Sequence, residues 1–147
     1  MSPSPDGLKI LLVDDYPSWL ERLSTLFEGV GYHITTATSV EEGWSKFLKE
    51  KPDLIITDYE MLPMPGGDGD ALIKAVRGFE KEYPTKTFIH VLSGYHAAQD
   101  SWRYWGADGY TDKNPYIHPS ASLEPLLQIP QRYFACPEGG FEGRRQP

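Results

Sequence analysis

The sequence predicts an α/β fold in which a doubly wound sheet of five parallel strands has helices on both faces. Short apolar runs alternate with segments whose apolar residues recur at helical spacing, and this alternation repeats five times. The runs at 10–13 and 54–56 are continuously apolar, which is typical of strands buried on both faces of a parallel sheet. A chain of 147 residues suits one domain of this kind.

The first predicted strand, 8–13, leads into a helix. Apolar residues at 19, 20, 23, 26, 27 and 30 have the spacing of one helix face. Pro17 lies near the start of this helix, where proline is tolerated, and Gly29 and Gly31 mark its end. The β-rich run at 32–37 is the second predicted strand.

A capping box at 39–42, Ser-Val-Glu-Glu, opens the second predicted helix, which closes at Pro52. The third strand, 54–57, is fully apolar up to its last residue and leads directly into Asp58. A loop rich in proline and glycine follows at 62–69.

The third predicted helix begins at Asp68 or Asp70, since either residue could cap it, and its apolar face includes Leu72 and Val76. The fourth strand, 87–92, ends at Ser93-Gly94.

A helix over 96–105 and a strand over 109–113 complete the five repeats. Prolines recur from residue 115 onward, so we expect an atypical, proline-broken region where a fifth helix would lie. The chain therefore divides into an N-terminal arm over 1–7, a domain over 8–128 and an irregular C-terminal tail over 129–147.

The composition limits the partners and the cellular setting. The formal net charge is −7, and residues 1–115 carry all of the excess negative charge. Such a surface repels nucleic acid and anionic membranes and suits a cation or a basic protein partner. The single cysteine, Cys136, excludes an intrachain disulfide, and neither a secretory signal nor a membrane-spanning run is visible. We therefore expect a cytoplasmic protein.

Charged and polar side chains stand where the predicted strands end: Asp14, Asp15, Asp58, Ser93 and Lys113. The carboxyl ends of parallel strands lie at one edge of a sheet, so these groups should converge. Three clustered carboxylates repel one another unless a cation lies among them, and Mg²⁺ suits oxygen ligands. A carboxylate beside the metal could attack phosphorus, while a serine and a lysine would contact the remaining phosphoryl oxygens.

Four segments carry a resemblance to a known family: 10–15 (ILLVDD), 54–61 (LIITDYEM), 91–95 (VLSGY) and 106–113 (GADGYTDK). Together, and in this order, they resemble the receiver domain of two-component response regulators. The resemblance covers residues 9–113 and implies a flavodoxin-like (βα)5 fold. It also implies a signalling domain that accepts a phosphoryl group and catalyses only its own phosphorylation and dephosphorylation.

The resemblance implies a role for each site residue. Asp58 is the expected phosphoacceptor, and Asp15 is expected to bind Mg²⁺ directly, together with Asp58 and the backbone carbonyl of Glu60. Asp14 is expected to act through metal-bound water. Without the resemblance, Asp14 and Asp15 could equally end a strand and cap a helix.

The remaining roles concern the phosphoryl group and the response to it. Ser93 is expected to donate a hydrogen bond to the phosphoryl group and to move toward it, and Lys113 to pair with it. Tyr110 matches the aromatic residue that turns inward on activation, although a tyrosine there could also serve packing alone. The implied partners are a sensor histidine kinase or histidine phosphotransfer protein, and a downstream protein effector or the remainder of a longer chain. A homodimer is also possible.

Three features next to the expected site depart from the family pattern. The loop at 62–69 is about three residues longer than usual. Glu60 stands two residues after Asp58, where its carboxylate could either orient a water molecule or repel the phosphoryl group. Asn114 separates Lys113 from Pro115, so the cis bond usual in the family either moves to the bond before Pro115 or is absent.

Two other functions are compatible with parts of the pattern. A pseudo-receiver would use the same fold as a protein-interaction module without phosphorylation, and the proline-broken region supports that reading. A phosphatase of the haloacid-dehalogenase type would also form an aspartyl phosphate. Such enzymes carry an aspartate two residues after the nucleophile, whereas this chain has Glu60 there.

Overall fold

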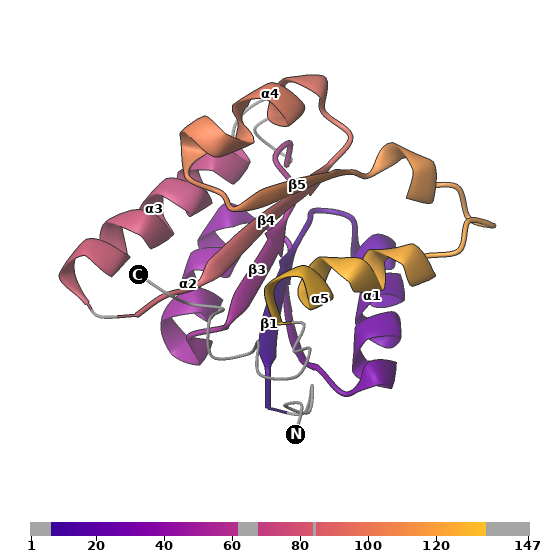
Figure 1. Ribbon diagram of the computed structural model, residues 1–147, viewed down its shortest axis with the longest axis horizontal. Coiled ribbons are helices and arrows are strands. Elements are labelled where there is room, and N and C mark those ends of the chain that lie inside the picture. Colours follow the sequence, from indigo (N-terminus) through magenta and orange to yellow (C-terminus); the bar gives the residue numbers. More distant parts are fainter. Residues whose placement is uncertain (1–6, 62–67, 84, 135–147) are drawn as a thin grey trace.

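The computed structural model describes residues 7–61, 68–83 and 85–134, and the predicted α/β fold is confirmed. Five parallel strands form one sheet in the order β2-β1-β3-β4-β5 (Figure 1). Their bounds are Lys9–Val13 for β1, His33–Ala37 for β2, Leu54–Thr57 for β3, Phe88–Ser93 for β4 and Gly109–Asp112 for β5. The strand order reverses between β1 and β3, and doubly wound sheets bind their ligands at such a switch point.

Helices connect successive strands as the apolar spacing predicted, and one further α-helix follows the last strand. Their bounds are Pro17–Val30 for α1, Val40–Glu50 for α2, Asp68–Glu82 for α3, His96–Trp105 for α4 and Gln128–Phe134 for α5. The predicted N-cap of α2 is formed, because the Ser39 hydroxyl accepts a hydrogen bond from the Glu42 backbone N–H at 3.1 Å. The Glu42 carboxylate accepts a bond of 2.7 Å from the backbone N–H of Thr38, one residue before the position that a capping box uses. Gly31 ends α1 in the left-handed conformation with a φ of 114°, which favours glycine.

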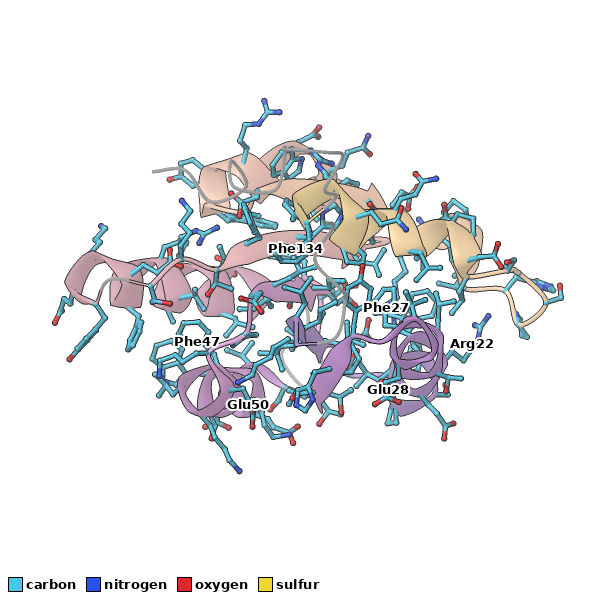
Figure 2. All side chains as sticks on the ribbon, turned by 60° about the horizontal axis from the view of Figure 1, so that its bottom comes forward. Arg22, Phe27, Glu28, Phe47, Glu50 and Phe134 are labelled. Atoms are coloured by element: carbon cyan, nitrogen blue, oxygen red, sulfur yellow. The ribbon has the colours of Figure 1, made fainter. Side chains whose placement is uncertain are left out.

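The core has two halves, one on each face of the sheet. Ile10 and Leu12 of β1 point toward α1 and α5, whereas Leu11 and Val13 point toward α2, α3 and α4. Figure 1 shows α1 and α5 on one side of the sheet and α2 and α3 on the other. Figure 2 shows the buried Phe27 of α1 turned inward, while neighbouring Glu28 faces solvent.

The fifth helix region is atypical, as predicted, but one expectation for the C-terminal segment is wrong. Two 3₁₀ helices, Asn114–Tyr116 and Glu124–Leu127, precede a seven-residue α5. Residues 129–134 were expected to be irregular, and they are helical. Pro130 is the third residue of α5, where the N–H that proline lacks has no partner within the helix. Burial of Tyr133 and Phe134 against the sheet face then stabilises this short helix.

Several expectations concern residues outside the described part of the chain. They are most of the N-terminal arm, residues 62–67 of the long loop and the tail from 135 onward. Among the described residues, no helix combines the length and the apolar character needed to span a membrane.

Candidate functional site

The sheet register brings the predicted site residues to one edge. Val13 of β1 pairs with Thr57 of β3, so the residues that follow them, Asp14 and Asp58, are neighbours. Ser93 is the last residue of β4 and pairs with Asp112 of β5, which places Lys113 immediately beyond. Residues far apart in the sequence therefore meet where the strands end.

Three carboxylates form a cluster that fits a hard cation. Oxygen atoms of Asp14, Asp15 and Asp58 all lie within 4.8 Å of one another. Asp14 and Asp58 are buried, and Asp15 is half-buried. A donor set made only of carboxylate oxygens matches the preference of Mg²⁺. These residues thus fit the predicted metal.

Burial raises the pKa of Asp14 to about 6. The positive charge of Lys113 opposes this rise, and the negative charge of Asp58 adds to it. The raised pKa means that the charged form of Asp14 lacks sufficient compensation from the protein alone. A bound cation would supply the missing compensation.

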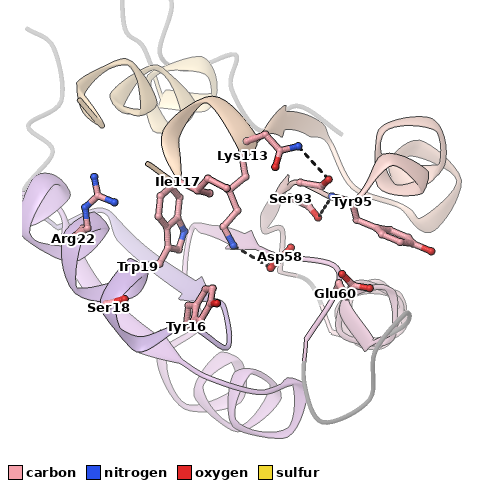
Figure 3. Close-up of a pocket in the computed structure, with 12 residues that line it drawn as sticks. Tyr16, Ser18, Trp19, Arg22, Asp58, Glu60, Ser93, Tyr95, Lys113 and Ile117 are labelled. Atoms are coloured by element: carbon pink, nitrogen blue, oxygen red, sulfur yellow. Dashed lines mark hydrogen bonds and ion pairs between the residues drawn. The ribbon is translucent and has the colours of Figure 1, made fainter. Parts of the chain in front are cut away.

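The ammonium group of Lys113 bridges two of these carboxylates. Its Nζ donates a hydrogen bond to Asp14 Oδ2 at 2.5 Å. It donates a second to Asp58 Oδ2 at 3.1 Å, which Figure 3 shows. Burial alone would lower the pKa of Lys113, but the attraction of Asp14 and Asp58 outweighs it and raises the pKa. The lysine is therefore held as an ammonium ion beside Asp58.

Asn114, which stands where the family has proline, does not prevent Lys113 from reaching the site. The backbone N–H of Lys113 donates to the carbonyl of Ser93 at 3.1 Å. The Asn114 amide donates to the carbonyl of Gly94 at 3.3 Å, and its backbone N–H donates to Asp112 Oδ1 at 3.0 Å. These bonds fix the loop after β5 against the loop after β4.

Ser93 joins the site to the fifth strand. Its side chain is fully buried, and its hydroxyl accepts a hydrogen bond from the Tyr95 backbone N–H at 3.1 Å. Its carbonyl accepts a second bond, of 2.9 Å, from the hydroxyl of the half-buried Tyr110. The predicted switch residue Tyr110 thus contacts the backbone of Ser93 directly.

A cavity of about 370 Å³ opens over Asp58. Ser93 and Lys113 line it on the strand side, and the exposed Glu60 lies at its rim (Figure 3). Tyr16, which is 68% exposed, also lines the opening. The space suffices for a phosphoryl group with part of the molecule that carries it.

Sequence reasoning missed two aromatic side chains beside this site, Trp19 and Tyr59. The ring centroid of Trp19, on α1, lies 5.2 Å from Lys113 Nζ. Tyr59 stacks with Tyr95 at 5.1 Å and with Trp105 of α4 at 4.3 Å. Trp102 and Trp105 of α4 are both half-buried. For Tyr59 the available signal was position, since it directly follows Asp58.

Comparisons with known proteins bear on the family and the fold of the chain. The sequence profile of the response regulator receiver domain matches residues 10–114. Protein PilH of Pseudomonas aeruginosa is 30% identical over 98 residues, which are 67% of this chain and 75% of PilH. The probable transcriptional regulator ycf27 of Guillardia theta is 36% identical over 105 residues, 71% of this chain and 39% of that protein. The two-component response regulator ARR11 of Arabidopsis thaliana is 36% identical over 84 residues, 55% of this chain and 15% of that protein. The matched region thus spans well under half of ycf27 and ARR11.

Solved structures give the same result for the fold. Chemotaxis protein CheY4 of Vibrio cholerae has a TM-score of 0.68 and 30% sequence identity, covering 85% of this chain and 97% of that chain. Response regulator TrrA of Thermotoga maritima, solved in complex with Mg²⁺-BeF, has the same TM-score, identity and coverage.

Proposed function

The chain belongs to the response regulator receiver domain family of two-component signalling, and on that basis we propose that it accepts a phosphoryl group on Asp58 with the help of Mg²⁺. The observation that carries the proposal is the grouping of three carboxylates around one ammonium. Asp14, Asp15 and Asp58 lie within 4.8 Å of one another, and Lys113 bridges two of them beside an open cavity. The relative TrrA, whose structure contains Mg²⁺-BeF, supports the choice of metal.

The proposed donor is a phosphohistidine on a sensor kinase or a histidine phosphotransfer protein. A carboxylate oxygen of Asp58 attacks phosphorus, and the bond between phosphorus and the imidazole nitrogen breaks. The nitrogen keeps the electron pair and takes up a proton. Bound Mg²⁺, held by Asp15, Asp58 and the Glu60 carbonyl, with Asp14 acting through water, would offset negative charge on the phosphoryl oxygens.

Two residues of this chain would handle the phosphoryl oxygens directly. Lys113 needs only a small movement, since its Nζ already lies 3.1 Å from Asp58 Oδ2. The Ser93 hydroxyl accepts a bond from Tyr95, and it would turn to donate its own proton to a phosphoryl oxygen. Glu60 at the rim of the cavity would set the lifetime of the product, either by orienting water or by repelling the phosphoryl group.

Movement of Ser93 would reach the surface by two routes. Its carbonyl accepts bonds from Lys113 and Tyr110, so a shift of the backbone would alter β5. Tyr95 follows two residues later and stacks on Tyr59, which in turn stacks on Trp105 of α4. Phosphorylation would thereby change the α4–β5 surface that a downstream effector, or a second copy of the chain, would contact.

The direct test is the intact mass of the protein after incubation with Mg²⁺ and acetyl phosphate. We expect one added phosphoryl group in the native chain and in Asp100→Ala, which changes an exposed carboxylate on α4. We expect none in Asp58→Ala, and none when the metal is removed. If the native chain gains no mass while another receiver domain is labelled in parallel, the proposal fails for small donors. A Mg²⁺ titration that shows no binding would then reject it altogether.

A further inference from the structure

The indole of Trp19 forms one wall around the ammonium group of Lys113. Trp19 lies in the first turn of α1 and is only 5% exposed. Its ring centroid is 5.2 Å from Lys113 Nζ and 5.8 Å from Arg22 Cζ. Figure 3 shows the indole between these two cationic side chains. A lysine at this distance from a tryptophan face is attracted by the negative charge of the π system.

Lys113 shares its two carboxylate partners with the cluster that could bind a metal. Its ammonium bridges Asp14 and Asp58, which are also carboxylates of the cluster that fits a metal. A cation bound by that cluster would compete with the ammonium for the same oxygens. Lys113 needs a third contact that neither carries a formal charge nor binds a metal, and an indole face meets both conditions.

The ring is fixed before any ligand arrives. Trp19 belongs to the same buried cluster as Leu20 and Leu23 of α1 and Leu126 of the second 3₁₀ helix. Arg22, on the other side in Figure 3, donates a hydrogen bond of 3.2 Å to the carbonyl of Ala121. The indole therefore cannot follow Lys113 if the lysine swings out of the site, and it favours the position beside Asp58.

We propose that Trp19 is a positioning residue for Lys113, holding the ammonium beside Asp58 when a cation and a phosphoryl group occupy the site. The inference rests on the proposed function and deepens it. An aromatic face attracts the ammonium without repelling the incoming phosphoryl anion, as a carboxylate in the same place would. Because Trp19 would act only through Lys113, substitution of Trp19 should not change the rate of phosphorylation in a chain that lacks the lysine.

The rate of phosphorylation from acetyl phosphate, followed by intact mass, tests this coupling in a double-mutant cycle. Trp19→Leu removes the π face and should slow the reaction about ten-fold, the size expected for one partly buried cation–π contact. Trp19→Phe keeps an aromatic face and should recover most of the rate. In a Lys113→Ala background, Trp19→Leu should cause no further loss.

Equal slowing by Trp19→Leu in both backgrounds, or a Trp19→Phe variant as slow as Trp19→Leu, would overturn the proposal. Thermal unfolding of each variant checks that it folds. Failure of the proposed function is a separate result, since the native chain itself would then gain no mass.

A second measurement does not depend on phosphorylation. The ε-methylene protons of Lys113 lie near the indole, so ring-current shielding should move their NMR signal upfield of the other lysines in the native, metal-free chain. The signal is assigned by its loss in Lys113→Ala. If the Lys113 ε-methylene protons have the same chemical shift as those of the other lysines, the Lys113 side chain does not pack against the indole face. That result would also overturn the proposal.

Discussion

The hydroxyl of Tyr110 donates a hydrogen bond of 2.9 Å to the carbonyl of Ser93, which ties the middle of β5 to the last residue of β4. We expect Tyr110→Phe to lower the free energy of unfolding by about 1 kcal/mol, the usual contribution of one such bond. Urea unfolding measures the loss. Amide exchange of Lys113, whose N–H shares the same acceptor, should also become faster. Tyr104→Phe, at a side chain 86% exposed, is the matched control and should change neither quantity.

Arg77 connects α3 to the end of the sheet opposite the site. Its guanidinium donates to the carbonyls of Thr87 and Gly106, each at 2.8 Å, and to the carboxylates of Glu80 and Asp108. Arg77→Met keeps the apolar stem but removes the cation that Glu80 and Asp108 share, and leaves them with the backbone N–H groups of Thr87 and Ile89. We therefore expect a loss of about 3 kcal/mol in the free energy of unfolding, measured by urea.

Lys74→Met provides the control for Arg77, because Lys74 forms an exposed ion pair with Asp70 on the same helix. Such a surface pair contributes about 0.5 kcal/mol or less. Similar losses in the two variants would contradict the importance assigned to the Arg77 network.

His90 is a buried histidine that the sequence pattern left without a role. Its ring nitrogens lie 2.7 Å from the hydroxyls of Tyr133 and Thr111. Burial, assisted by the charge of Arg132, lowers the pKa of His90 to about 3. Between pH 6.5 and 3 the unfolded chain therefore binds a proton that the folded chain does not, and His90 makes stability fall as the pH falls.

We expect His90→Gln to remove this dependence. As the pH falls from 6.5 toward 4, the free energy of unfolding should decrease more steeply in the native chain than in the variant. The difference in slope should be up to about 1.4 kcal/mol per pH unit. Urea unfolding at several pH values measures the difference. His33→Gln, on the exposed side of β2, should leave the slope as it is in the native chain. Parallel curves for the native chain and His90→Gln would show that His90 is not held neutral.

Asp14 should make the binding of Mg²⁺ depend on pH. Its pKa is raised to about 6, so below that value the metal-free protein carries a proton that Mg²⁺ must displace. We expect the affinity for Mg²⁺ to be constant above pH 7 and to fall below pH 6, approaching about ten-fold per pH unit. Titration calorimetry in two buffers of different ionisation enthalpy would count the released proton. Asp14→Asn should bind more weakly and lose this proton release. Constant affinity between pH 7.5 and 5 would contradict the prediction.

The fold and the ends of the strands were predictable because they depend on local pattern. The apolar runs at 10–13 and 54–57 predict where β1 and β3 end, and therefore that Asp14 and Asp58 lie at the same edge of the sheet. Contacts between distant segments were not predictable in this way. Trp19 and Lys113 lie near opposite ends of the domain sequence, although they are in contact in the structure. The periodicity of α1 shows that Trp19 faces inward, but it does not indicate which side chain Trp19 contacts. The proline content led to the wrong prediction of an irregular segment where α5 lies. Pro130 is compatible with this helix because it stands in the first turn, where the backbone N–H has no partner within the helix.

The stack of Tyr95, Tyr59 and Trp105 offers a way to observe the proposed switch. Tyr95 donates its backbone N–H to the Ser93 hydroxyl, and that bond would break if the hydroxyl turned to a phosphoryl group. Because Tyr59 is nearly parallel to both neighbours, at 14° and 6°, a shift of Tyr95 alters the shielding of the whole stack. We therefore expect the indole N–H signal of Trp105 to move on phosphorylation, as seen in a ¹H–¹⁵N NMR spectrum.

The chain provides an internal control in Trp44 of α2, which stacks on Phe47 of the same helix and meets Phe79 of α3 edge-on. Its indole signal should stay in place while that of Trp105 moves. Tyr95→Ala should leave phosphorylation detectable by mass but reduce the shift at Trp105, because the ring nearest Ser93 is gone. If a chain shown by mass to carry the phosphoryl group leaves the Trp105 signal unmoved, α4 does not respond through this stack. The change in Ser93 would then have to reach the surface through Tyr110 and β5 alone.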